Sequence, residues 1–233
     1  SAPVWSSVIE TSSLTVRATL GPSMSSATAG TDPLNPTSAA VTPDGRELWV
    51  SQVDNLSRDS PGQLTVYSTA FGTIVGTVDV GGRPFFLALS TDGTVAYVAD
   101  KESCDLREIS VASLTVASTV AWPTAHGCPF GIGAGAVDGT AYTVTGSDHT
   151  YDEAHAGNKL GIVDFPSGSV RILGPVGRDP VTVALSPDGA TAYVVDADRA
   201  DVLEVDTATG AVTKTVPLVL SGPAEPLRPA ARR

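Results

Sequence analysis

The sequence of 233 residues predicts an all-β fold, a β-propeller of four full four-stranded antiparallel blades with an incomplete blade at the N-terminus. Two observations lead to this prediction. A segment that contains an Asp-Gly pair occurs four times, and the pairs begin at positions 44, 92, 138 and 188, at intervals of 48, 46 and 50 residues. The Val- and Thr-rich runs between these pairs lack helical periodicity, and a repeat of this length with four strands is typical of a propeller blade.

The first half of each repeat is predicted to be a β-hairpin. Each Asp-Gly pair stands between two strand-like runs, as in 41–50, 89–98 and 185–194, while the copy at 136–144 has one residue fewer before its Tyr. Glycine can adopt the positive φ that a tight hairpin turn requires. We therefore interpret the aspartates as turn residues rather than as a catalytic carboxylate set; they are Asp44, Asp92, Asp138 and Asp188.

The second half of each repeat supplies two more strands. One starts near Leu64, Leu106, Leu160 and Val202, and a short polar turn leads from it to a further Val- and Thr-rich strand such as 212–216. Residues 1–20 align only with this second half, so the first two strands of that unit are missing. The sequence therefore predicts a five-bladed ring with a reduced blade, part of a larger ring, or a ring that a second chain or a missing segment completes.

The repeats resemble a known family. The segments Tyr97-Val98-Ala99-Asp100 and Tyr193-Val194-Val195-Asp196 carry the likeness, which covers residues 37–218 and is similar to the YVTN-type β-propeller repeat family, related to lactonase-like and surface-layer propellers. The repeats predict a single propeller domain over residues 1–218, and the Pro-rich composition of residues 219–233 predicts a flexible tail. Because the family includes binding, structural and enzymatic members, it does not choose a function.

Composition limits the partners that we expect. The chain has 14 Lys and Arg against 25 Asp and Glu, a net charge of −11, which argues against binding to nucleic acid or to anionic membranes. No apolar run approaches the roughly 20 residues that span a bilayer, so no transmembrane segment is expected. Cationic, metal-ion and neutral small-molecule partners remain open.

The two cysteines predict a disulfide. Cys104 follows the second strand of one blade and Cys128 lies in the connection that leaves the same blade, so both fall at one end of the blades. Such a bond fits a secreted or cell-envelope protein. The alternative, a nucleophilic pair of Cys128 with His126, lacks a third group to orient the base.

One end of the predicted blades carries all the insertions. The connections between second and third strands and between blades lie there, and the insertions are 21–36, 53–62, 122–129, 146–159 and 174–180. Irregular loops on a rigid scaffold are where binding sites concentrate, so we predict a ligand site at this end, around the axis. The candidate ligand-binding residues are Arg83, Asp100, His126, Phe130, Arg178 and Asp196.

Each candidate also has a purely structural interpretation. Arg83 and Arg178 stand at equivalent places before innermost strands, where they could bind a carboxylate or phosphate or could pair with nearby acids. Asp100 and Asp196 end second strands, where a ring of carboxylates would favour cations but would also keep loops soluble. Phe130 could line an apolar pocket or belong to the core between blades.

The histidines form a candidate metal site. His126, His149 and His155 all lie at the same end, and the loop from 148 to 155 adds carboxylates, a ligand set suited to a transition metal such as zinc or copper. Their spacing matches no standard metal motif, so a solvated polar loop is the alternative.

Two functions are consistent with the sequence. The first is an exported or cell-envelope module that binds a small molecule or a protein at its loop-rich axial face. The second is an enzyme with a funnel-shaped active site that acts on a small carbonyl or lactone substrate by metal or acid-base chemistry. No nucleophile elbow, phosphate-binding loop or dinucleotide fingerprint is present in the sequence to identify a reaction.

Overall fold

A computed structural model describes residues 6–10, 15–20, 35–53, 62–146 and 157–218. Within these ranges the protein consists of β-strands and one 3-10 turn, η1 (Thr124–His126). The strands form four four-stranded antiparallel sheets and one two-stranded sheet. The predicted all-β architecture of four blades is therefore confirmed.

The four blades follow the phase of the repeat. Blade one contains β3 (Asn35–Val41), β4 (Glu47–Val53), β5 (Gly62–Ser68) and β6 (Ile74–Val80). Blade two contains β7 (Pro84–Leu89), β8 (Val95–Asp100), β9 (Asp105–Ser110) and β10 (Thr115–Ala121). Blade three contains β11 (Gly131–Ala134), β12 (Thr140–Val144), β13 (Lys159–Asp164) and β14 (Ser169–Pro175). Blade four contains β15 (Pro180–Leu185), β16 (Thr191–Asp196), β17 (Asp201–Asp206) and β18 (Val212–Pro217).

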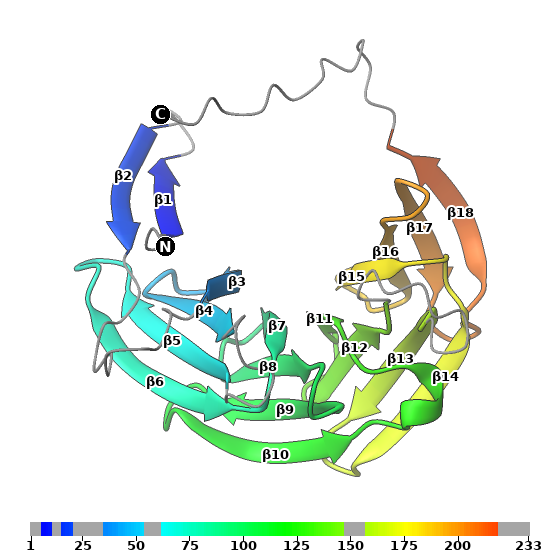
Figure 1. Cartoon of the computed structure of the whole chain (residues 1–233), viewed down its shortest axis with the longest axis horizontal. Helices are drawn as coiled ribbons and strands as arrows, with labels where there is room; N and C mark the ends of the chain where they lie inside the picture. The colour runs from blue at the N-terminus through cyan, green and yellow to red at the C-terminus, as the bar shows by residue number, and fades with distance from the viewer. Residues whose placement is uncertain (1–5, 11–14, 21–34, 54–61, 147–156, 219–233) are drawn as a thin grey trace, which may run out of the picture.

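The blades follow one another around an arc, with their first strands innermost (Figure 1). Strand β3 contacts β7, β7 contacts β11, and β11 contacts β15, so the inner strands of consecutive blades pack side by side. The two-stranded sheet, β1 (Ser6–Glu10) with β2 (Thr15–Leu20), lies beside blade one (Figure 1). Its antiparallel pairing confirms the prediction that residues 6–20 form a strand pair.

Three apolar cores lie between consecutive blades. We call the face of a blade that is turned to the next blade along the chain its forward face, and the opposite one its rear face. An aromatic residue on the forward face of the second strand shares a core with a buried alanine on the rear face of the next blade. These pairs are Trp49 with Ala96, Tyr97 with Ala141, and Tyr142 with Ala192. Burial of large side chains in these cores, worth roughly 1.5–3 kcal/mol each, holds the blades together.

The Asp-Gly turns are built alike in three blades. In blade one, Asp44 Oδ1 accepts hydrogen bonds from the Thr42 hydroxyl (2.7 Å) and from the Arg46 N–H (3.0 Å), and Gly45 has a φ of 72°. Asp92 and Asp188 accept the same pair of bonds, each from a serine hydroxyl and a backbone N–H. The prediction that these aspartates are turn residues is confirmed.

The turn of blade three departs from the other three. With one residue fewer, its Gly139 N–H donates to the Tyr97 hydroxyl of blade two at 3.1 Å. Tyr97 also stacks on Phe165 of blade three, with ring centroids 5.3 Å apart. Burial is the main cause that raises the pKa of Tyr97 to about 12, so its hydroxyl stays protonated and bridges two blades at neutral pH.

Candidate functional site

Buried aspartates fix the loops that lead into the inner strands. Asp100, the last residue of β8, accepts hydrogen bonds at Oδ1 from the N–H groups of Arg83 (3.0 Å) and Ser103 (3.2 Å). Asp196, at the end of β16, accepts from the N–H groups of Arg178 (2.9 Å) and Asp179 (3.0 Å). Both carboxylates are buried, so each ties the end of a second strand to the loop before the first strand of the same blade.

The contacts of Asp100 and Asp196 are therefore structural ones. Burial raises the pKa of Asp100 against the opposing effect of its two N–H donors, and its Oδ2 is buried with no hydrogen-bond partner among the described residues. Whether either carboxylate also contacts a ligand stays a prediction. What both do in this structure is set the position of the arginine that follows the loop.

Three phenylalanines and two cations meet where blades two and three begin; we call them the aromatic–cation cluster, comprising Arg83, Phe85, Phe86, Lys101 and Phe130. The Arg83 guanidinium lies 4.9 Å from the centre of the Phe85 ring, and the Lys101 Nζ lies 4.9 Å from the centre of the Phe130 ring. Phe130 in turn contacts Phe85 at 5.1 Å and Phe86 at 5.3 Å between ring centroids. Phe85 and Phe86 lie in the innermost strand β7, and Arg83 directly precedes it. Phe130 directly precedes the innermost strand β11, and Lys101 directly follows β8, so the cluster lies where two innermost strands begin.

Within the cluster, the side chain of Arg83 is confined by its neighbours. The Arg83 side chain is 20 % exposed, its guanidinium lies 3.6 Å from Glu102 Oε1, and its Nε is buried with no hydrogen-bond partner in the described part of the chain. The expected equivalence of Arg83 and Arg178 is wrong by one residue, because Asp179 stands at the place of Arg83: the two carbonyls accept the corresponding hydrogen bonds from Ala197 and Lys101. Arg178, one residue earlier in the corresponding loop, has a side chain that is 65 % exposed and pairs with Asp198 at 3.1 Å. Both arginines donate a backbone N–H to the aspartate that ends the second strand of their blade, but of the two it is Arg83 that is confined between an aromatic ring and a carboxylate.

The predicted disulfide is confirmed. Cys104 and Cys128 are bonded, with Cα atoms 4.9 Å apart. Cys104 adopts a φ of 53°, and its carbonyl accepts a hydrogen bond from the Trp122 N–H at 3.0 Å. The bond joins the turn that follows Lys101 to the loop that precedes Phe130, and so it holds together the two loops that carry one cation–aromatic pair of the cluster.

The structure describes one of the three histidines, His126. His126 ends the turn η1, is half-buried, and donates its backbone N–H to Pro123 O at 3.2 Å. His149 and His155 lie outside the described residues. Among the residues that the structure does describe, no group of three His, Cys, Asp or Glu side chains could hold a metal ion. A metal site made with His149 and His155 stays a prediction.

Sequence reasoning singled out Arg83 and Phe130 but missed Lys101. The signal was present, because Lys101 directly follows the aspartate that ends the second strand, and blade four has Ala197 at that place. Asp100 and Asp196 are the same residue at corresponding places, whereas Lys101 and Ala197 differ. A position that differs between blades is not required by the repeat and can serve another role. The contact with Phe130, some 30 residues later, required the fold.

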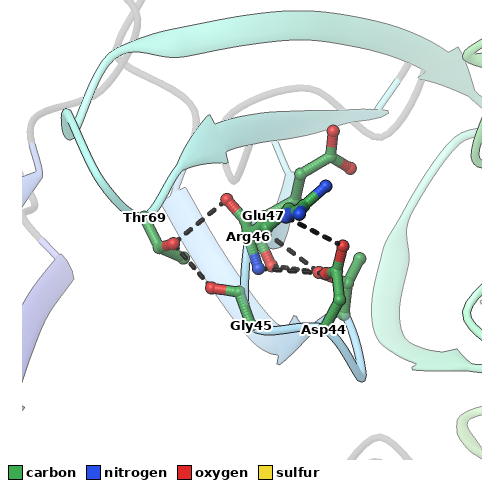
Figure 2. Close-up of polar contacts among 6 residues, drawn as sticks. Asp44, Gly45, Arg46, Glu47 and Thr69 are labelled. Atoms are coloured by element: carbon green, nitrogen blue, oxygen red, sulfur yellow. Dashed lines mark hydrogen bonds and ion pairs between the residues drawn. The ribbon is translucent and has the colours of Figure 1, made fainter.

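A hollow lies at the Asp-Gly end of the blades, opposite the aromatic–cation cluster. A cavity of about 360 Å³ opens between the turns of blades one and two, and its lining consists of Thr42, Pro43, Asp44, Arg46, Glu47, Asp92, Gly93, Val111 and Ala112. Figure 2 shows how its rim is built: the Thr69 hydroxyl donates to the carbonyls of Gly45 (2.6 Å) and Arg46 (3.0 Å), and the Arg46 N–H donates to Asp44.

Asp44 and Asp92, which line this hollow, accept hydrogen bonds within their own turns. The Thr42 hydroxyl is the main cause that lowers the pKa of Asp44, and the Ser90 hydroxyl does the same for Asp92. Both carboxylates accept hydrogen bonds from backbone N–H groups as well. We therefore regard the hollow as a by-product of two neighbouring turns.

Comparisons with known proteins support the fold. No protein-family model matches the chain. The chain is 27 % identical over 168 residues, 71 % of its length, to a protein of Mycobacterium tuberculosis named as the seven-bladed β-propeller protein Rv1057, and it spans 40 % of that relative. A solved structure of Kuenenia stuttgartiensis hydrazine synthase superposes with a TM-score of 0.62 and 21 % identity, over 78 % of this chain and 48 % of that one.

These likenesses agree with the blades described above. The relative's name and the structural neighbour both support a β-propeller, although neither confirms the YVTN-type repeat. No helix in the described part of the chain has the length and apolar character needed to cross a membrane. The chain is a β-propeller protein with four complete blades in the residues described.

Proposed function

We propose that the protein is an exported propeller module that binds a small anionic molecule at the aromatic–cation cluster. The observation that carries the proposal is the confinement of Arg83 and Lys101 on the rings of Phe85 and Phe130, at the axial end of two blades. The disulfide supports export, because such bonds persist in oxidising compartments. The relative's name supports a ring with more blades than the four described.

The chemistry of the cluster favours an acidic group on the ligand. A guanidinium presents several N–H donors in a fixed fork that suits a carboxylate or phosphate, and the buried Arg83 Nε needs an acceptor. The net charge of −11 repels anions at long range, so binding must come from short-range contacts of this kind. The faces and edges of Phe85 and Phe130 would hold an apolar or planar part of the same molecule.

The loops that form the cluster are fixed before any ligand arrives. Asp100 holds the backbone of Arg83, and the disulfide holds the loop of Lys101 against the loop of Phe130. A site whose loops are already ordered loses less conformational entropy on binding. This arrangement supports a binding role at the loop-rich end.

The proposal is tested with a panel of small anions. Citrate, benzoate, indole-3-acetate and inorganic phosphate are screened for a rise in melting temperature, and hits are measured by isothermal titration calorimetry. We expect Arg83→Ala to weaken binding by at least about tenfold, as loss of a charge-assisted hydrogen bond does. Arg178→Ala is the matched control, because it removes an exposed arginine from the corresponding loop of blade four, and affinity should change by less than about twofold.

Two results would overturn the proposal. One is a panel in which no anion raises the melting temperature. The other is a hit whose affinity falls equally in Arg83→Ala and Arg178→Ala, which would indicate a general effect of charge. Breakdown of a small lactone added to the same panel, lost in Arg83→Ala, would favour the enzyme hypothesis instead.

A further inference from the structure

An arginine and a glutamate of blade two lie side by side at the loop-rich end. The Arg83 Nη1 lies 3.6 Å from Glu102 Oε1, and the two side chains are 20 % and 32 % exposed. This distance is longer than the roughly 2.7–2.9 Å of a charge-assisted hydrogen bond. On strand β9 of the same blade, by contrast, Arg107 donates to both oxygens of Asp105, at 3.1 and 3.2 Å. The contact of Arg83 with Glu102 is therefore looser than a closed ion pair, and both side chains are partly accessible to a ligand.

One buried carboxylate holds the backbone on both sides of this contact. Asp100 Oδ1 accepts the N–H of Arg83 at 3.0 Å. The same oxygen accepts the N–H of Ser103, the residue after Glu102, at 3.2 Å. The disulfide at Cys104 then ties the end of this short turn to the next loop. The loops therefore present a cation and an anion at a fixed spacing before any ligand binds.

Glu102 opposes a ligand whose only charge is negative. A carboxylate that binds Arg83 comes close to the carboxylate of Glu102, and like charges repel at short range. An ammonium group beside the ligand's own carboxylate turns this repulsion into attraction. Such a ligand has no net charge, so the net charge of −11 does not repel it at long range. The pair of charges therefore favours a zwitterion over a simple anion.

We propose that the molecule bound at the aromatic–cation cluster is an aromatic α-amino acid. Its carboxylate binds Arg83 and its ammonium group binds Glu102, which suits two receptor groups 3.6 Å apart because both charges of an α-amino acid lie on one carbon atom. Its side chain packs on the rings of Phe85 and Phe130, whose centroids are 5.1 Å apart. This assignment rests on the proposed function, since it keeps the acidic group at Arg83, and it adds the chemical class of the ligand.

The first test compares four ligands on the full chain by isothermal titration calorimetry at neutral pH. L-phenylalanine carries both charges and a ring, phenylpropionate lacks the ammonium group, phenethylamine lacks the carboxylate, and L-alanine lacks the ring. We expect L-phenylalanine to bind at least about tenfold more tightly than each of the others, as the loss of one charge-assisted contact or of one buried ring implies. This comparison needs no variant, so it is independent of whether a substitution impairs folding.

The second test removes each charge of the pair in turn. Arg83→Ala and Glu102→Gln should each weaken the binding of L-phenylalanine by at least about tenfold. Glu102→Gln should leave the binding of phenylpropionate unchanged or make it tighter, because the like charge is gone. Asp198→Asn is the matched control, since it removes the same unit of charge from the acid that pairs with Arg178 in blade four. The control should change the affinity for L-phenylalanine by less than about twofold.

The outcomes separate the amino-acid ligand from the proposed function. Phenylpropionate that binds as tightly as L-phenylalanine, and is lost in Arg83→Ala, would overturn the amino-acid ligand and leave the anion site standing. Tighter binding of both ligands by Glu102→Gln would do the same, because Glu102 would then only compete with the ligand. Phenethylamine that binds as tightly as L-phenylalanine, or no binding of any acid in this test and in the anion panel, would overturn both. L-phenylalanine binding that Arg83→Ala and Glu102→Gln both reduce, and that Asp198→Asn leaves unchanged, supports the proposal.

Discussion

The two ends of the blades differ in how closely the blades resemble one another. At the Asp-Gly end, blades one, two and four repeat the same bonds between a hydroxyl, a carboxylate and the backbone. At the loop-rich end the corresponding loops differ, since Arg83 is confined on a ring, whereas blade four has Asp179 at that place and an exposed Arg178 beside it. The blades are alike at the Asp-Gly end, where the turns of three blades share one geometry. They differ at the loop-rich end, where blades two and three alone form the aromatic–cation cluster.

The acids show the same contrast. Asp92 at the Asp-Gly end is exposed, and the Ser90 hydroxyl is the main cause that lowers its pKa. Asp100 at the other end of the same strand is buried, and burial raises its pKa although two N–H groups donate to it. One strand thus carries aspartates near both ends whose environments move the pKa in opposite directions.

The largest loss of stability should follow from removing the disulfide, which joins two loops at the loop-rich end. Replacing both Cys104 and Cys128 by serine should lower the free energy of unfolding by about 3 kcal/mol, because a loop of this length gains entropy in the unfolded chain. Urea denaturation monitored by tryptophan fluorescence measures the effect. A loss under about 1 kcal/mol would mean that the loops of Lys101 and Phe130 are held by packing alone.

The next largest effect compares the two kinds of aspartate in blade four. Asp196→Ala leaves the N–H groups of Arg178 and Asp179 without their acceptor in a buried place, which should cost about 2 kcal/mol. Asp188→Ala, in the exposed turn, should cost clearly less. Thermal and urea unfolding of the two variants measures the difference, and an equal loss would contradict the division into a buried and an exposed role.

A smaller effect distinguishes two turns that look alike. Gly45 and Gly93 have φ values of 72° and 74°, so Gly→Ala at either should cost about 1 kcal/mol for the left-handed backbone. A Cβ at Gly93 would lie 2.7 Å from Pro43 Cδ, whereas a Cβ at Gly45 would meet nothing within 4 Å. We expect Gly93→Ala to be the more destabilised in urea denaturation, and the reverse order would show that the two turns do not pack against each other.

The smallest effect is one of pH. The folded pKa of Asp188 is lowered, chiefly by the Ser186 hydroxyl, so its contribution is present above about pH 4 and is lost as the pH falls through the folded pKa. The pKa of Asp100 is raised, so its ionised form is penalised and stability from this group increases as the pH falls toward 4.

Urea denaturation between pH 3 and pH 7 should separate these signs. We take the free energy of unfolding of the wild type minus that of the variant. This value should fall toward the acidic end for Asp188→Asn and should rise for Asp100→Asn. Parallel changes in both variants would mean that the two ends do not differ in this respect.

Much of the fold could be predicted because its signals are local. An Asp-Gly pair between two strand-like runs requires only neighbouring residues to form a hairpin, and four copies in phase identify a blade. The disulfide was also predictable, since blade topology puts Cys104 and Cys128 at one end. The candidate site was predictable only in part, because the contact of Lys101 with the ring of Phe130 joins residues from two different blades.

The sequence by itself determined the strands, the turns and the phase of the blades, because period-two patterning and the backbone freedom of glycine act within a few residues. Only the tertiary structure decided which of the two arginines is confined between a ring and a carboxylate and which aspartates are buried. Arg83 and Arg178 both stand just before an innermost strand, but Glu102 lies beside Arg83 and Asp198 beside Arg178. Those acids reach the arginines because the second strand of each blade runs back beside the first, and Lys101 reaches the ring of Phe130 because consecutive blades pack together. The surroundings of such a residue therefore depend on parts of the chain that are distant in sequence.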